Sequence, residues 1–73
     1  MTRGYIDEPA DLGRIVLATR LGHKLSQDAL SAQLGISQRY LSELERGRTK
    51  LFDDKFIGVL NQLGIRLTVE VDE

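Results

Sequence analysis

The chain has 73 residues, a net charge of −1 and no cysteine. This length favours a single small domain near the lower limit for a stable core, so we expect oligomerisation to add stability. The absence of cysteine excludes disulfides and thiolate metal sites, and one histidine cannot build a metal cluster, so no cofactor is expected. No signal peptide is recognisable and no apolar run is long enough to span a bilayer, which predicts a cytoplasmic protein without a membrane partner.

Charge is unevenly distributed along the chain. Residues 14–50 contain seven basic and three acidic residues, a net charge of +4. The two flanks contain three basic and eight acidic residues, a net charge of −5. The basic centre predicts a polyanionic partner. For the acidic flanks, a basic protein surface and simple solvation remain equal alternatives.

The first eight residues are predicted to form an N-terminal arm, followed by a helix that opens at Pro9 and fades near Gly22. Proline is tolerated in the first turn of a helix, and the acidic residues before it favour the positive end of the helix dipole. Gly13 lies inside this helix at a cost of about 1 kcal/mol relative to alanine, unless close packing requires it.

Two short helices and a tight turn are predicted between Leu25 and Gly47. Ser26 and Ser37 are good N-caps, because a serine hydroxyl accepts a hydrogen bond from the free amides of the first turn. Gly35 suits a helix end that needs a positive φ. Two helices joined by a glycine-containing turn form a helix-turn-helix. An ordinary helical hairpin that binds no DNA is the alternative.

A fourth helix is predicted to start at Asp53 or Asp54 and to end at Gly64. Its aromatic residues fit the apolar stripe of this helix, so we expect them in the core rather than stacked on nucleic-acid bases. The stripe consists of Phe52, Phe56, Val59, Leu60 and Leu63.

The pattern changes from helical to alternating over Ile65 to Val71, where every second residue is aliphatic, as is typical of a strand. The sequence offers no convincing partner strand, and a lone strand leaves its backbone groups unpaired. We therefore expect residues 64–73 to pair antiparallel with the same strand of a second copy, giving a homodimer. A disordered tail is the alternative. The expected dimerisation residues are Ile65, Leu67, Val69 and Val71.

The central motif resembles the DNA-binding helix-turn-helix of Cro/C1-type (XRE) phage repressors and their bacterial relatives. This resemblance implies a mainly α, four-helix, lambda-repressor-like domain over residues 9–63, with the motif at residues 26–46. Related domains often carry glycine at the position of Lys24, and we expect Gly22 to serve instead. The matching residues are Ser26, Gln27, Leu30, Leu34, Gly35, Ile36, Ser37, Leu41, Ser42, Leu44, Glu45 and Gly47.

The order of elements, four helices and then one strand, is similar to that of HipB-type antitoxins. In that family, two C-terminal strands form a shared sheet, and the dimer binds operator DNA and also holds a HipA-like serine/threonine kinase toxin. The resemblance implies a cytoplasmic, nucleoid-associated homodimer that represses its own operon at a palindromic operator and acts as the antitoxin. The residues of this second match are Leu51, Phe52, Phe56, Val59, Leu60, Leu63, Gly64 and the predicted strand.

The start of the second motif helix enters the major groove in this motif. Gln pairs with adenine and Arg with guanine, so base contacts are predicted for Ser37, Gln38, Arg39 and Ser42. Backbone contacts, which set register rather than sequence, are predicted for Gln27, Tyr40, Arg46, Arg48 and Lys50.

Some of these roles have alternatives. The resemblance implies that Gln27 also braces the recognition helix. Tyr40 has two alternatives to a backbone contact, a thymine methyl and a place in the core. Glu45 is expected to be structural and paired with Arg20. Glu43 is expected to orient a neighbouring arginine, with a cytosine contact as its alternative.

Two other functions remain open: a stand-alone phage-type repressor, and a protein-interaction module on the same fold. Enzymatic function has no support, because the sequence shows no nucleophile–base pair, no metal constellation and no Gly-rich phosphate loop.

Overall fold

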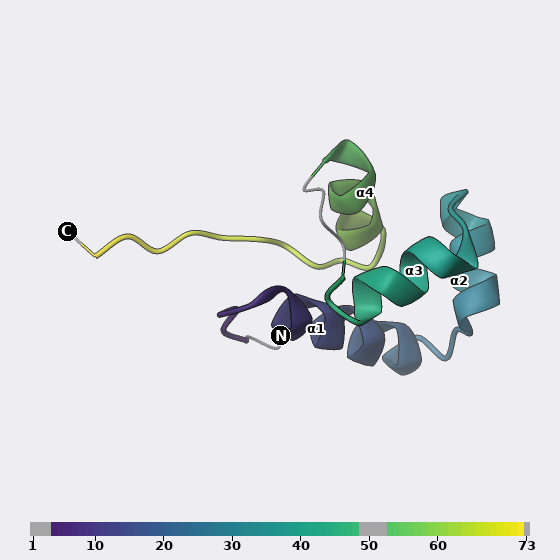
Figure 1. The fold of residues 1–73 in the computed structure, drawn as a ribbon, viewed down its shortest axis with the longest axis horizontal. Helices are drawn as coiled ribbons and strands as arrows, with labels where there is room; N and C mark the ends of the chain where they lie inside the picture. Colours follow the sequence, from purple (N-terminus) through teal and green to yellow (C-terminus); the bar gives the residue numbers. More distant parts are fainter. Residues whose placement is uncertain (1–3, 49–52, 73) are drawn as a thin grey trace.

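The computed structural model describes residues 4–48 and 53–72, which contain four helices (Figure 1). The predicted mainly α fold is therefore confirmed. None of the described helices is long and apolar enough to cross a membrane. The helices are α1 (Pro9–Gly22), α2 (Gln27–Leu34), α3 (Gln38–Glu45) and α4 (Asp54–Gln62).

Side-chain caps begin three of the helices where the sequence predicts them. Ser26, Ser37 and Asp53 each accept, through a side-chain oxygen, the backbone N–H three residues further on, at 3.0 Å. Each such cap stabilises a helix by about 1 kcal/mol. The Asp11 carboxylate closes the start of α1, because it accepts the backbone N–H groups of Asp7 and Glu8.

The apolar core is built from all four helices. Burial of such side chains is the main favourable term in folding, at roughly 25 cal/mol per Å². Phe56 is among the buried residues, so its predicted core position is confirmed, whereas Phe52 lies outside the described residues. The buried apolar residues are Val16, Leu30, Leu41, Leu44, Phe56, Val59, Leu60 and Leu63.

Helices α1 and α3 touch backbone to backbone at Gly13. A Cβ at this position would lie 2.5 Å from the carbonyl oxygen of Glu45 and 2.7 Å from that of Leu44. Only glycine allows this approach, so close packing accounts for a glycine inside a helix. The contact fixes the end of α3 against α1.

The prediction that Gly22 would supply the unusual backbone before α2 is wrong. Gly22 is the last residue of α1, and Lys24 itself has a φ of 59°. A side chain strains this left-handed conformation. Lys24 adopts it because its N–H and that of Leu25 bond to carbonyls of the last turn of α1, which fixes the connection.

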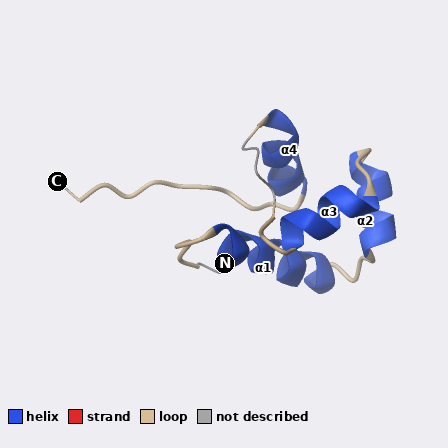
Figure 2. Cartoon of the chain, in the orientation of Figure 1, coloured by secondary structure: helices blue, strands red, loops and turns tan. Residues whose placement is uncertain are grey.

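The C-terminal residues after α4 leave the helical body as an extended segment (Figures 1 and 2). The predicted strand is not present in this single chain, because residues 65–72 have no strand assignment. A strand requires a neighbouring strand to complete its hydrogen bonds, and residues 4–48 and 53–72 supply none. Pairing between two copies stays a prediction.

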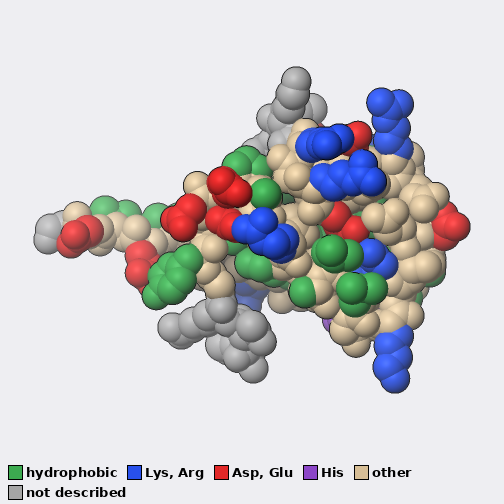
Figure 3. Space-filling model, turned by 60° about the horizontal axis from the view of Figure 1, so that its bottom comes forward, with side chains coloured by type: hydrophobic (Ala, Val, Ile, Leu, Met, Phe, Trp, Pro, Cys, Tyr) green, Lys and Arg blue, Asp and Glu red, His purple; other side chains and the backbone are tan. Residues whose placement is uncertain are grey.

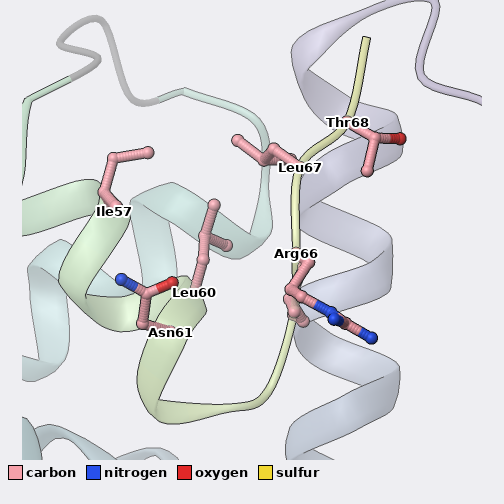
Figure 4. A pocket seen from close by; sticks show the side chains of 7 residues that line it. Ile57, Leu60, Asn61, Arg66, Leu67 and Thr68 are labelled. Atoms are coloured by element: carbon pink, nitrogen blue, oxygen red, sulfur yellow. The ribbon is translucent and has the colours of Figure 1, made fainter. Parts of the chain in front are cut away.

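The first residues of this segment nevertheless alternate as the sequence predicts. Leu67 points toward Ile57 and Leu60, whereas Arg66 and Thr68 point the other way (Figure 4). Ile65 packs against the core. Between the segment and α4 lies an open, largely apolar hollow of about 320 Å³.

Candidate nucleic-acid interface

Helix α3 buries one side and exposes the other. Leu41 and Leu44 are 0% and 2% exposed and anchor the helix in the core. Gln38 and Arg39 are exposed at its first turn, and Ser42 is half-buried one turn later. A rigidly anchored helix with exposed polar side chains at its N-terminal end can be inserted into a major groove.

Ser37 has a local structural role as well as the predicted base contact. Its hydroxyl oxygen accepts the N–H of Tyr40. The hydroxyl proton is directed elsewhere and can be donated to an acceptor. The residue is exposed, so capping leaves it accessible to a ligand.

Tyr40 lies on the core side of the domain, in line with the alternative role given to it above. Its ring packs against the core, and its buried hydroxyl has no hydrogen-bond partner among the described residues. The ammonium of Lys55 lies 4.2 Å from the ring centroid, a cation–π contact between α4 and α3. Burial raises the pKa of Tyr40, and the charge of Asp53 adds to this effect. A contact between Tyr40 and the DNA backbone stays a prediction.

Arg20 and Glu45 form a buried ion pair between α1 and the end of α3, as predicted. The guanidinium donates to both oxygens of the carboxylate, at 2.7 Å and 3.2 Å. A third N–H of Arg20 donates to the carbonyl of Leu25 at 2.8 Å. Loss of one partner of such a pair is strongly destabilising, because the other charge stays buried and uncompensated.

This ion pair is connected to the exposed end of α3 through Gln27. The amide nitrogen of Gln27 donates to Oε1 of Glu45 at 2.9 Å. The amide nitrogen of Gln38 in turn donates to Oε1 of Gln27 at 3.4 Å. The bracing role implied for Gln27 is therefore confirmed, and its phosphate contact stays a prediction.

The predicted backbone-contacting arginines lie on the surface. Arg46 and Arg48 are exposed after the end of α3, whereas Lys50 lies outside the described residues. Glu43 does not orient a neighbour as expected, because the ion pairs among residues 4–48 and 53–72 are Arg14–Asp11 and Arg20–Glu45. In the view of Figure 3, Lys and Arg side chains lie over the helical body, while acidic ones gather toward the C-terminal tail.

Several contacts of this region have no signal in the sequence. The Gln27–Glu45 hydrogen bond joins residues 18 positions apart, and the Lys55–Tyr40 contact joins two helices. Neither separation along the sequence matches the repeat of a helix or a strand. Of the network, sequence reasoning identified the Arg20–Glu45 pair and the link from Gln27 to the recognition helix.

Comparisons with known proteins agree with this geometry. The helix-turn-helix family profile matches residues 16–69. The chain is 33% identical over 64 residues to the uncharacterized HTH-type transcriptional regulator y4mF of Sinorhizobium fredii (strain NBRC 101917 / NGR234), covering 88% of this chain and 84% of that protein.

Among solved structures, the fold is similar to a HipB variant in a complex with the O2 20mer. The TM-score is 0.80 at 21% sequence identity, over 99% of this chain and 100% of that one. At this identity, the likeness shows the shared fold. The family match and the sequence relative show more: the chain belongs to the Cro/C1-type helix-turn-helix family of DNA-binding transcriptional regulators, which are generally not enzymes.

Proposed function

We propose that this protein is a cytoplasmic, sequence-specific repressor that binds a palindromic operator as a homodimer, and that it is the antitoxin of a HipA-like kinase. The observation that carries DNA recognition is the geometry of α3. Its apolar side is buried in the core, and Gln38 and Arg39 are exposed at the end that enters the groove in this motif.

The homodimer rests on the exposed C-terminal segment. Leu67, Val69 and Val71 are 43%, 84% and 70% exposed, a row of aliphatic side chains that water solvates poorly. Pairing with a second copy would cover them and complete the backbone hydrogen bonds. A two-fold dimer would also place two recognition helices about one DNA turn apart, roughly 34–36 Å, which calls for a palindromic operator.

Selection from random double-stranded DNA tests sequence recognition. We expect Gln38→Ala and Arg39→Ala each to weaken binding to the selected operator by about 1–3 kcal/mol, with much smaller effects on random DNA. Equal losses on both DNAs would assign these residues to the DNA backbone. A chain that selects no sequence would contradict the proposal and favour a protein-interaction module.

Removal of the residues after Leu63 tests the dimer. Analytical ultracentrifugation should show a monomer, and the truncated chain should lose high-affinity operator binding while keeping its helices by circular dichroism. A truncated chain that still sediments as a dimer would show that the C-terminal segment is not the dimerisation element.

The antitoxin role is supported by the shared fold with HipB, and its partner would be a kinase encoded next to this gene. Co-expression of the two proteins should give a complex that co-purifies and should relieve growth inhibition by the kinase. A repressor that binds DNA but never the neighbouring kinase would be a stand-alone regulator.

A further inference from the structure

We propose that Glu45, a buried residue at the far end of the recognition helix from Gln38, determines which base Gln38 prefers. Glu45 would act as a positioning residue, through the chain of hydrogen bonds that links its carboxylate to the amide of Gln38. This inference rests on the proposed function, because it deepens the account of how α3 reads DNA.

The chain of hydrogen bonds has a fixed direction because its inner end is a carboxylate. An ionised carboxylate can only accept hydrogen bonds, so Gln27 must turn its amide nitrogen toward Glu45. The amide oxygen of Gln27 then faces the opposite way, toward α3. Gln38 must meet this oxygen with a donor, and its amide nitrogen is the group that does so.

The ion pair keeps the carboxylate in this role. The side chains of Glu45 and Arg20 are 5% and 8% exposed, so water does not compete for their oxygens and nitrogens. Arg20 donates to both carboxylate oxygens and has no acceptor of its own. The arginine therefore holds the carboxylate in one orientation, with Oε1 shared between Arg20 and Gln27.

The hydrogen bond to Gln27 determines which groups of Gln38 remain available to bind DNA. One of its N–H groups is used by Gln27, which leaves one N–H donor and the acceptor Oε1. Adenine presents the complementary pair in the major groove, an acceptor at N7 and a donor at N6. Guanine presents two acceptors, N7 and O6, so one of them would face the acceptor Oε1 of Gln38 with no hydrogen between the two oxygen or nitrogen atoms. The orientation imposed from Glu45 thus favours adenine over guanine.

Reversing the direction of these hydrogen bonds should weaken the preference for adenine over guanine. In Glu45→Gln, the closest donor of Arg20, at 2.7 Å in the native pair, retains the amide oxygen of the new side chain. The new amide nitrogen then faces Gln27, which must present its oxygen inward and its nitrogen toward Gln38. Gln38 accepts a hydrogen bond from that nitrogen with one lone pair of Oε1 and keeps both of its N–H donors, so guanine, with its two acceptors, is no longer disfavoured.

The experiment compares base preferences by selection from randomised double-stranded DNA. The operator position that Gln38 reads is identified as the one whose preference disappears in Gln38→Ala. The wild-type chain should favour adenine there by about 5- to 150-fold. Glu45→Gln should lower the adenine-to-guanine ratio at that position by about tenfold or more, with other positions unchanged.

Glu45→Gln leaves the charge of Arg20 buried without its carboxylate partner, so this variant can fail to fold. A second variant therefore tests the same hydrogen bonds. The double variant Arg20→Met, Glu45→Leu removes both charges together, a replacement that folds tolerate well. It frees the Gln27 amide to take either orientation, so preference at the Gln38 position should fall toward onefold. Circular dichroism confirms folding, and Glu43→Gln removes a carboxylate from the same helix outside the network and should change nothing at that position.

The outcomes separate this inference from the function on which it rests. An adenine-to-guanine ratio that stays within about twofold of the wild-type value in the folded double variant would overturn the role of Glu45. If Glu45→Gln does not fold, the double variant decides alone. A wild-type chain that selects no sequence would instead overturn the proposed function.

Discussion

Gly13 sets how closely α1 approaches the recognition helix, and its replacement by alanine tests that contact. Alanine normally stabilises the interior of a helix relative to glycine by about 1 kcal/mol. At Gly13, however, the added methyl group would meet the backbone carbonyls of Leu44 and Glu45, at 2.7 Å and 2.5 Å. The sign of the effect depends on which contribution is larger.

The steric contribution is expected to win. A carbon–oxygen contact relaxes only beyond about 3.3 Å, so α1 and α3 must move apart by roughly 0.8 Å. A gap of 0.5–1 Å forfeits a quarter to a half of the dispersion attraction across an interface, and overpacking typically costs about 1–3 kcal/mol. After the gain in helix propensity, we expect Gly13→Ala to lower the free energy of unfolding by up to about 2 kcal/mol. This corresponds to a drop in Tm of up to roughly 16 °C.

Gly58 provides the matched control. It lies inside α4, is exposed, and a Cβ there would have nothing within 4 Å. Gly58→Ala should therefore raise the free energy of unfolding by about 0.5–1 kcal/mol. Urea denaturation followed by far-UV circular dichroism measures both variants, and an unchanged m-value indicates that the comparison is valid. The reasoning fails if Gly13→Ala is as stable as the parent or more so.

Three further predictions use the same assays together with DNA titration. Lys24→Gly should stabilise the chain by about 0.5–1 kcal/mol, because glycine adopts the left-handed conformation without strain. Lys24→Ala keeps a Cβ and should give no such gain. Equal urea midpoints for the two variants would contradict backbone strain at this position. The N–H of Asp7, and then that of Glu8, hold the pKa of Asp11 below its ordinary value of 3.8, with a further contribution from Arg14. The ionised carboxylate therefore contributes fully to stability above that value, and this contribution is lost as the pH falls through the lowered pKa. The urea midpoint of Asp11→Asn should therefore change less than that of the parent between pH near 6 and pH near 3. Arg48→Ala should weaken binding to operator and random DNA alike and reduce the log–log salt slope by about 0.9, whereas an unchanged slope would place Arg48 away from the phosphates.

The secondary structure could be predicted from the sequence because it depends on neighbours. Ser26 and Ser37 cap helices through the residue three positions ahead, and such a contact is visible in a short window. The apolar faces of α3 and α4 follow from helical spacing in the same way. The C-terminal segment shows the limit of this reasoning, since its alternation can be recognised in the sequence but a strand needs a partner, which the described part of one chain does not supply.

The candidate site was predictable only in part. The sequence indicated that Gln38 and Arg39 would be exposed on α3, because both positions are polar on a helix whose other side is apolar. It did not indicate that Tyr40 would bury its hydroxyl or that Lys24 would take a positive φ. Both outcomes depend on what another part of the chain places beside the residue.

The sequence by itself determined where the helices begin and end, which faces are apolar, and which polar residues lie at the exposed end of the recognition helix. These properties arise from interactions within one or two helical turns. The tertiary structure decided the approach of α1 to α3 at Gly13 and the hydrogen-bond chain from Arg20 through Glu45 and Gln27 to Gln38. These hydrogen bonds join residues 11 to 25 positions apart, and Gly13 meets Leu44 and Glu45 of a different helix. Both kinds of contact form only when folding brings separate helices together and excludes water from between them.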